Sequence, residues 1–233
     1  MKRLNTLLQL VSDNVGYGEK HQIVATESEA TIYVYDIIGS DYGGVDERQF
    51  VNDVAALKVA DIALRINSPG GNVFAARAMM TALASSSATV TAYIDGIAAS
   101  AATSLIMAAD KVVMTRGGQM MIHEAWTGAV GNKRDFAAQT QILTNVDAEI
   151  AKDYAKRTGK NVSDLAAMME AETWFSADQA KQIGFVDEIV EPTKSPQNKW
   201  NLSVFKNVPT ALTATPKSQG ISAKRRVALT RSR

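Results

Sequence analysis

The sequence predicts an α/β fold with a mainly parallel sheet, and three observations support this prediction. Short alternating or apolar runs typical of strands are separated by longer amphipathic runs typical of helices. Two of the strands end in glycine-containing turns that lead directly into a helix. The chain has 233 residues, 46% of them hydrophobic, which is enough for one sizeable core. Strand–helix–strand connections of this length form right-handed crossovers, which make the sheet largely parallel.

The first half of the chain supplies two of these strand–helix units. An alternating run within residues 23–38 predicts a strand, and a glycine-rich loop follows it. Asp46 then opens an expected helix with an apolar face. The next strand, over residues 61–68, runs into the turn sequence NSPGG, and a helix over residues 73–86 follows. The two consecutive glycines, Gly70-Gly71, either form a simple tight turn or direct a backbone N–H toward a bound carbonyl group.

The segment from Ala88 to Asp110 changes character at Gly96. Residues before this glycine alternate as in a strand, and small helix-tolerant residues follow it. We therefore expect a tight turn at Gly96, with Ser100 at or just inside the N-terminus of a helix. The unpaired N–H groups and the positive dipole end of a helix start suit a developing oxyanion. An ordinary helix-capping serine is the alternative.

The next strands bring a histidine to the same edge. A strand over residues 112–115 and a glycine turn lead into a second strand that ends at His123. The only other histidine, His21, lies in a polar stretch typical of a surface. Loops at the carboxyl ends of parallel strands lie along one edge, so Gly70-Gly71 and Ser100 should be neighbours. His123 is then the only plausible neutral-pH base for Ser100, although a histidine at a strand end can also be purely structural.

The longest expected helix spans Lys133 to Arg157. It carries one narrow apolar stripe, which either docks on another subunit or lies across its own domain. A helix over residues 162–169 and a helix between Ser176 and Gly184 precede a final strand. Glu172, in the loop between these two helices, is a candidate to orient the histidine or is a solvated carboxylate. The stripe consists of Phe136, Leu143, Val146, Ile150 and Tyr154.

Charge divides the chain near Pro192. The whole chain carries 25 Lys and Arg against 24 Asp and Glu, but residues 193–233 contain nine basic residues and no acidic one. We expect an N-terminal peripheral segment over residues 1–24, a folded domain over residues 25–191 and a basic, disordered tail over residues 192–233. Such a tail solvates the protein, tethers it to an acidic partner or is removed by proteolysis.

Several classes of protein are disfavoured by composition. The chain has no cysteine, so no disulfide framework, thiolate nucleophile or cysteine metal site is available, and a reducing compartment such as the cytoplasm is expected. No apolar run reaches the roughly 18 residues of a membrane span, and no signal peptide opens the sequence. No phosphate-binding glycine loop of the Walker type is present. We therefore expect neither a membrane nor a specific nucleic acid as partner.

Four motifs in order resemble the Clp protease proteolytic subunit family. They are INSPGG, GIAAS, MIH and WFSADQAKQIGFVDEI, and the serine of the second lies 29 residues after the last glycine of the first. The runs YDIIG and VNDVAAL and the Glu-Thr-Trp before the final helix resemble more closely the phage branch of this family, the ClpP-like head maturation (prohead) proteases. The resemblance covers about residues 30–190.

The resemblance implies an α/β fold of the ClpP/crotonase type, with repeated ββα or βαβ units and a protruding long helix, and the activity of a serine endopeptidase. Ser100 matches the family nucleophile and His123 its base. The backbone N–H groups of Gly71 and Ala101 match the oxyanion donors. Glu172 falls where the housekeeping enzymes have an aspartate, and its carboxylate can hold the imidazole tautomer if the backbone is set back. The alternative acids are Glu170 and Asp147.

The resemblance also implies partners. The helix from Lys133 to Arg157 would join protomers into a ring or stacked rings, and no cofactor or metal would be needed. The substrates would be the scaffold and the major capsid protein inside a procapsid assembling in the host cytoplasm. No N-terminal docking element for an unfoldase is recognisable, so the resemblance does not extend to an unfoldase partner. The basic tail would attach to the assembly or be trimmed by the protease.

Two other functions are compatible with parts of this pattern. A crotonase-type acyl-CoA enzyme would share the fold and the paired oxyanion donors, but it would not need Ser100 and His123 as a nucleophile–base pair. The first turn of the helix after the glycine loop contains Phe74-Ala75-Ala76-Arg77 and supplies no carboxylate for such an enzyme. A catalytically silent assembly protein would keep the ring and bind capsid or scaffold subunits.

Overall fold

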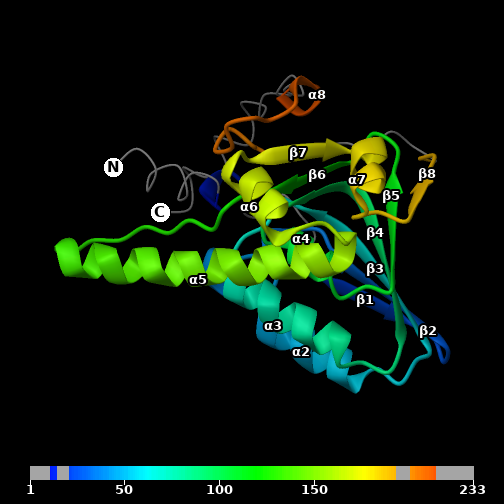
Figure 1. The fold of residues 1–233 in the computed structure, drawn as a ribbon. Coiled ribbons are helices and arrows are strands. Elements are labelled where there is room, and N and C mark those ends of the chain that lie inside the picture. The colour runs from blue at the N-terminus through cyan, green and yellow to red at the C-terminus, as the bar shows by residue number, and fades with distance from the viewer. Residues whose placement is uncertain (1–10, 15–20, 193–199, 214–233) are drawn as a thin grey trace, which may run out of the picture.

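The computed structural model describes residues 11–14, 21–192 and 200–213. Within them a twisted sheet is covered by helices on one face, and one long helix extends away from the body (Figure 1). The strands are β1 (Gln22–Ala25), β2 (Glu29–Val34), β3 (Asp61–Ser68), β4 (Thr89–Ala99), β5 (Lys111–Thr115), β6 (Gln119–Ile122), β7 (Thr173–Ser176) and β8 (Glu188–Val190). The helices are η1 (Ser40–Tyr42), α2 (Glu47–Ala56), α3 (Val73–Ala84), α4 (Ala102–Ile106), α5 (Lys133–Thr158), α6 (Val162–Glu170), α7 (Ala177–Ile183) and α8 (Thr210–Thr213).

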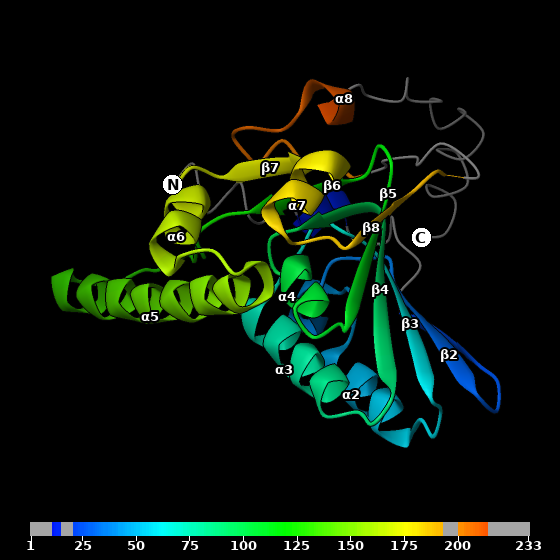
Figure 2. The ribbon, with the colours of Figure 1, turned by 45° about the vertical axis from the view of Figure 1, so that its right-hand side comes forward.

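The sheet has the predicted mainly parallel topology. Its order is β1-β2-β3-β4-β5-β8, and β6 pairs with both β4 and β7. The pairs β2–β3, β3–β4, β4–β5, β4–β6 and β5–β8 are parallel, whereas β1 pairs antiparallel with β2 and β7 antiparallel with β6. Figure 2 shows α2, α3 and α4 along one face of β2 to β5. The α/β class with parallel crossovers is thereby confirmed.

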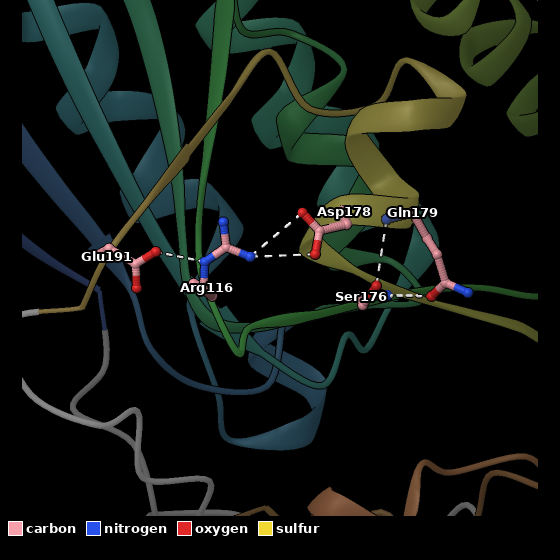
Figure 3. Close-up of polar contacts among 5 residues, drawn as sticks. All are labelled: Arg116, Ser176, Asp178, Gln179 and Glu191. Carbon is pink, nitrogen blue, oxygen red and sulfur yellow. Dashed lines mark hydrogen bonds and ion pairs between the residues drawn. The ribbon is translucent and has the colours of Figure 1, made fainter.

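Helix boundaries follow local capping chemistry. The Asp46 carboxylate accepts hydrogen bonds from the backbone N–H groups of Arg48 and Gln49, so α2 begins where predicted. Ser176 and Gln179 form a capping box at the start of α7, and Gly184 ends that helix in a left-handed conformation. Figure 3 shows this capping box.

Arg116 forms ion pairs with two acidic residues near the β8 edge of the sheet. Nε of Arg116, in the turn after β5, donates a 2.5 Å hydrogen bond to Glu191, and Nη1 lies 3.3 Å from the Asp178 carboxylate at the start of α7 (Figure 3). All three side chains are largely exposed, so the ion pairs contribute little to stability. They link the turn after β5 to the residue after β8 and to the start of α7.

The expected turn at Gly96 is wrong, because β4 continues through this glycine to Ala99. The first part of β4 pairs with β5, and residues 97–99 pair with β6 instead. Gly96 lies where the strand changes partner, and a Cβ there would come within 2.8 Å of the Asn67 side chain. Pairing with β6 therefore overrides the helical preference of the alanines, and the turn occurs at Ser100.

The long helix α5 is anchored at only one end. Ile150, Ala151 and Tyr154 are its buried residues, and Phe136 near its start is 51% exposed. The first half of α5 projects beyond the rest of the described chain (Figures 1 and 2). No described helix is both long enough and apolar enough to cross a membrane.

The chain beyond residue 192 is partly folded, contrary to the expected disordered tail. Trp200, Leu202 and Phe205 are buried in a second apolar cluster with Ile97 and other residues of the sheet face that α2 to α4 leave uncovered. A basic composition averaged over the tail hides this short apolar pattern. The expected tail also includes residues 193–199 and 214–233, and most of the expected N-terminal segment is residues 1–10 and 15–20; these ranges lie outside the described residues.

Candidate active site

Ser100 occupies a strained turn between β4 and α4. Its φ angle is 54°, a left-handed backbone conformation that residues other than glycine seldom adopt. The surrounding hydrogen bonds hold it there: the Ser100 N–H donates to the Met121 carbonyl at 2.9 Å, and the Thr103 hydroxyl donates to the Ser100 carbonyl at 2.6 Å. The Thr103 hydroxyl is in turn hydrogen-bonded to the hydroxyl of Tyr154 on α5. Strain of this kind, maintained by its surroundings, is characteristic of functional turns.

His123 lies next to Ser100, as the sequence predicts. Nε2 of His123 lies 2.7 Å from Oγ of Ser100, within hydrogen-bonding distance. Sheet register explains the meeting, because Ala99 at the end of β4 pairs with Met121 of the parallel strand β6. The residues that follow these two strands therefore emerge side by side at one edge of the sheet.

The Gly70-Gly71 turn also reaches this edge, as predicted. A Cβ on Gly70 would lie 2.7 Å from Cβ of Ser100 and 3.0 Å from the Ala101 nitrogen. The turn is fixed by two backbone hydrogen bonds to Ile38, from the Ile38 N–H to the Gly70 carbonyl at 2.9 Å and from the Asn72 N–H to the Ile38 carbonyl at 2.8 Å. Within the described residues, the N–H groups of Gly71 and Ala101 donate no hydrogen bond. Two free amides beside a serine hydroxyl can bind an oxyanion.

Burial keeps the His123 imidazole neutral. Removal from solvent lowers the pKa of His123 to about 4, and the Glu172 carboxylate opposes this shift while the Lys206 cation reinforces it. The rings of Phe205 and Trp126 lie 5.6 Å and 6.3 Å from the imidazole in edge-on contact. A neutral imidazole can accept the proton of the Ser100 hydroxyl at neutral pH.

The pH dependence of Ser100 reactivity should follow this pKa. We expect the rate of labelling by a fluorophosphonate to be constant at neutral pH and to fall as the pH decreases through about 4, because protonated His123 cannot act as a base. Removing the nearby cation by Lys206→Met raises the pKa of His123, so the fall should occur at higher pH. The exposed Lys58→Met is the control and should leave the profile unchanged. A profile that does not move in Lys206→Met contradicts the assignment.

Glu172 lies beside the histidine without a hydrogen bond to it among the described residues. Both side chains line one cavity of about 150 Å³, and Glu172 is only 9% exposed. Its φ angle is 51°, so it shares with Ser100 the left-handed conformation. Oε1 of Glu172 accepts hydrogen bonds from the Asn207 N–H at 2.7 Å and from Nε1 of Trp174 at 3.4 Å. Within the described residues, no hydrogen bond joins Glu172 to His123.

The two alternative acids are placed differently. Glu170 lines the same cavity as His123. Asp147 on α5 accepts a 2.7 Å hydrogen bond from the Ala125 N–H, and burial raises the pKa of its carboxyl group. Neither makes a hydrogen bond to His123 among the residues that the structure describes. Asp147 thus fixes the chain just after the histidine.

Three residues at this site were missed by the sequence analysis. Phe205 packs against His123, Lys206 lines the cavity, and Asn207 binds Glu172. All three lie in the segment expected to be a disordered tail. The apolar residues Trp200, Leu202 and Phe205 were the one available signal that this segment packs on the domain.

The chain is similar to proteins of one known family. The family model described as Clp protease matches residues 37–193. The ATP-dependent Clp protease proteolytic subunit 2 of Corynebacterium diphtheriae is 31% identical over 138 residues, which are 58% of this chain and 69% of that protein. The subunit of the same name from Mycolicibacterium paratuberculosis is 27% identical over 165 residues, which are 70% of this chain and 83% of that protein.

A solved structure confirms the fold. A point mutant of ClpP1 from Listeria monocytogenes superposes with a TM-score of 0.62 at 23% identity, over 70% of this chain and 92% of that one. The expected fold of ClpP type is therefore confirmed. The separate family match, over residues 37–193, includes the strands β4 and β6.

Proposed function

The chain belongs to the Clp protease family of serine peptidases, and on that premise we propose that it is a serine endopeptidase with Ser100 as nucleophile and His123 as general base. The observation that supports this most strongly is the 2.7 Å contact between Oγ of Ser100 and Nε2 of His123. The free N–H groups of Gly71 and Ala101 would form the oxyanion hole. In this proposal the peptidase domain spans residues 25–191, and Glu172 is the acid of the triad.

The reaction is acyl transfer to water. His123 takes the proton from the Ser100 hydroxyl as Oγ attacks the peptide carbonyl, and the two N–H groups stabilise the oxyanion of the tetrahedral intermediate. His123 then gives the proton to the leaving amine, and the C–N bond breaks. Water, activated by the same imidazole, attacks the acyl-enzyme and releases the acid product and Ser100.

Reaction with a fluorophosphonate probe tests this function. The phosphorus should form a bond to Oγ of Ser100 with loss of fluoride, and the modified peptide is identified by mass spectrometry. The contact between the Ser100 hydroxyl and the His123 imidazole favours a serine peptidase over a crotonase-type acyl-CoA enzyme, because the latter needs no such pair. An intact protein that fails to react at Ser100 would favour that enzyme class or a silent assembly protein.

We include a homo-oligomer in the proposed function. The apolar stripe of α5 continues from the buried Ile150 and Tyr154 outward to Phe136, which is half exposed. A second copy of the chain is the partner that the family relationship favours, in a ring or in stacked rings.

Oligomer assembly should depend on this exposed end. The change Phe136→Asp places a charge on the stripe, so we expect the wild-type oligomer to dissociate into smaller species. Ala138→Asp is the control, because it adds the same charge at an exposed residue two positions along α5, which lies on the opposite side of the helix. Sedimentation velocity measures both. If Phe136→Asp retains the wild-type mass, the stripe is not the interface.

The proposed substrates are the scaffold and the major capsid protein of an assembling procapsid. The support is the resemblance of the runs YDIIG and VNDVAAL to the phage head maturation branch. Co-assembly of the wild-type chain or its Ser100→Ala variant with both proteins tests this proposal. Cleavage of the scaffold or capsid protein only with the wild type supports it, and intact proteins in both assemblies contradict it.

A further inference from the structure

Residues 200–208, here called the C-terminal strap, cross the catalytic edge of the domain. The strap is anchored by burial of Trp200, Leu202 and Phe205 against β4 and β6. Nε1 of Trp200 also donates to Oδ1 of Asn67 at 3.4 Å. These buried side chains fix the path of the strap as far as Phe205, which packs against His123.

Beyond its last anchor the strap reaches Glu172. The Asn207 N–H donates to Oε1 of Glu172 at 2.7 Å. The Asn207 side-chain amide donates to the Ala171 carbonyl at 2.8 Å and to the Glu172 carbonyl at 3.2 Å. A single residue therefore binds both the backbone and the carboxylate of Glu172. These bonds hold a residue whose left-handed backbone conformation is unfavourable for any residue other than glycine.

The strap does not obstruct the nucleophile. The small cavity at Ser100 is lined by residues of α3, α4, α5 and the chain after β6, and by none from the strap. No hydrogen bond within the described chain joins the strap to Ser100, Gly71 or Ala101. The contact between Ser100 and His123 forms with the strap in place. These observations favour a supporting role over a blocking one.

We propose that Asn207 is a positioning residue that holds the Glu172 carboxylate beside His123. The inference depends on the proposed peptidase function. Asn207 uses Oε1 of Glu172 and leaves Oε2 without a hydrogen bond among the described residues. The carboxylate therefore keeps its negative charge close to the imidazole and retains a free oxygen. The peptidase site includes residues of the strap, beyond the end of the domain expected at residue 191.

A double-mutant cycle on the full chain tests this role, with the rate of Ser100 labelling by a fluorophosphonate as the readout. Asn207→Ala removes the side-chain bonds to the Ala171 and Glu172 carbonyls, which hold the Asn207 N–H against the Glu172 carboxylate, and we expect labelling to slow about tenfold. In a Glu172→Gln background the same change should have no further effect, because Asn207 acts only through the carboxylate. An equal loss in both backgrounds would overturn the proposal, as would a wild-type or faster rate in Asn207→Ala.

The pH profile provides a second readout. The charged groups facing His123 or its cavity are Glu172, Lys206, Glu124 and Glu170. Loss or displacement of the Glu172 charge lowers the pKa of His123, so the acid limb should move to lower pH in Glu172→Gln and in Asn207→Ala. A limb that moves only in Glu172→Gln would overturn the proposal.

A matched strap variant separates positioning from stability. Asn201→Ala also removes two side-chain hydrogen bonds, one donated to the Asp13 carboxylate and one accepted from the Ser203 N–H, at the end of the strap remote from Glu172. It should label at the wild-type rate, even if its melting temperature falls as far as that of Asn207→Ala. Slow labelling in both would assign the effect to strap stability and overturn the proposal. Absence of labelling in the wild type would instead refute the peptidase function itself.

Discussion

Replacing Ser100 by alanine is expected to abolish fluorophosphonate labelling and to lower peptide hydrolysis by roughly 10⁴-fold or more. Among the described residues, the Ser100 hydroxyl is the only group hydrogen-bonded to the imidazole, so no other side chain replaces it as nucleophile. Hydrolysis of a fluorogenic peptide and labelling are measured on the same preparation. The control is Ser87→Ala, an exposed serine in the turn before β4, which should behave as wild type.

The same position should show a conflict between stability and activity. Ser100→Gly also lacks the hydroxyl and should be equally inactive, but glycine accommodates a φ of 54° without strain. We therefore expect its free energy of unfolding to exceed that of Ser100→Ala by about 1 kcal/mol. Urea denaturation measures this difference. Equal stability of the two variants would show that the turn relaxes once the hydroxyl is gone.

The sheet edge that carries Ser100 and His123 was predictable because parallel topology constrains which strand ends lie together. Ser100, His123 and the Gly70-Gly71 turn each follow a strand, and parallel strands present these ends on one side. Periodicity was enough to recognise the strands, and glycine was enough to place the first turn. The meeting of hydroxyl and imidazole follows from the register between β4 and β6, which no local pattern in the sequence encodes.

Features set by long-range contacts were not predictable. The alanines after Gly96 favour a helix locally, yet they form a strand because β6 lies beside them. The strand β7 is only four residues long and is defined by its antiparallel pairing with β6. The C-terminal strap could not be predicted from composition, because its three buried side chains change the mean composition of a long basic segment very little.

Gly70→Ala is expected to lower the labelling rate of Ser100 by roughly 100-fold or more, the loss typical of a disrupted oxyanion hole. The added Cβ would lie 2.7 Å from both the Ala99 carbonyl oxygen and Cβ of Ser100, and 3.0 Å from the Ala101 nitrogen. These neighbours are backbone or close to it, so they cannot rotate away. Either the glycine turn or the serine turn must move, and the donors then no longer converge on one carbonyl oxygen.

Gly117→Ala is the matched control, because it places an alanine in the same left-handed backbone conformation but without a close contact to its new Cβ. Gly117 has a φ of 89°, close to the 98° of Gly70, and a Cβ on it would meet no atom within 4 Å. Both variants should lose about 1–2 kcal/mol of stability from the left-handed alanine, but only Gly70→Ala should also lose reactivity. Denaturation and labelling are measured on both. Equal labelling rates would show that contact between the glycine turn and Ser100 is not needed for the chemistry, because the strain is the same in both and only the contact differs.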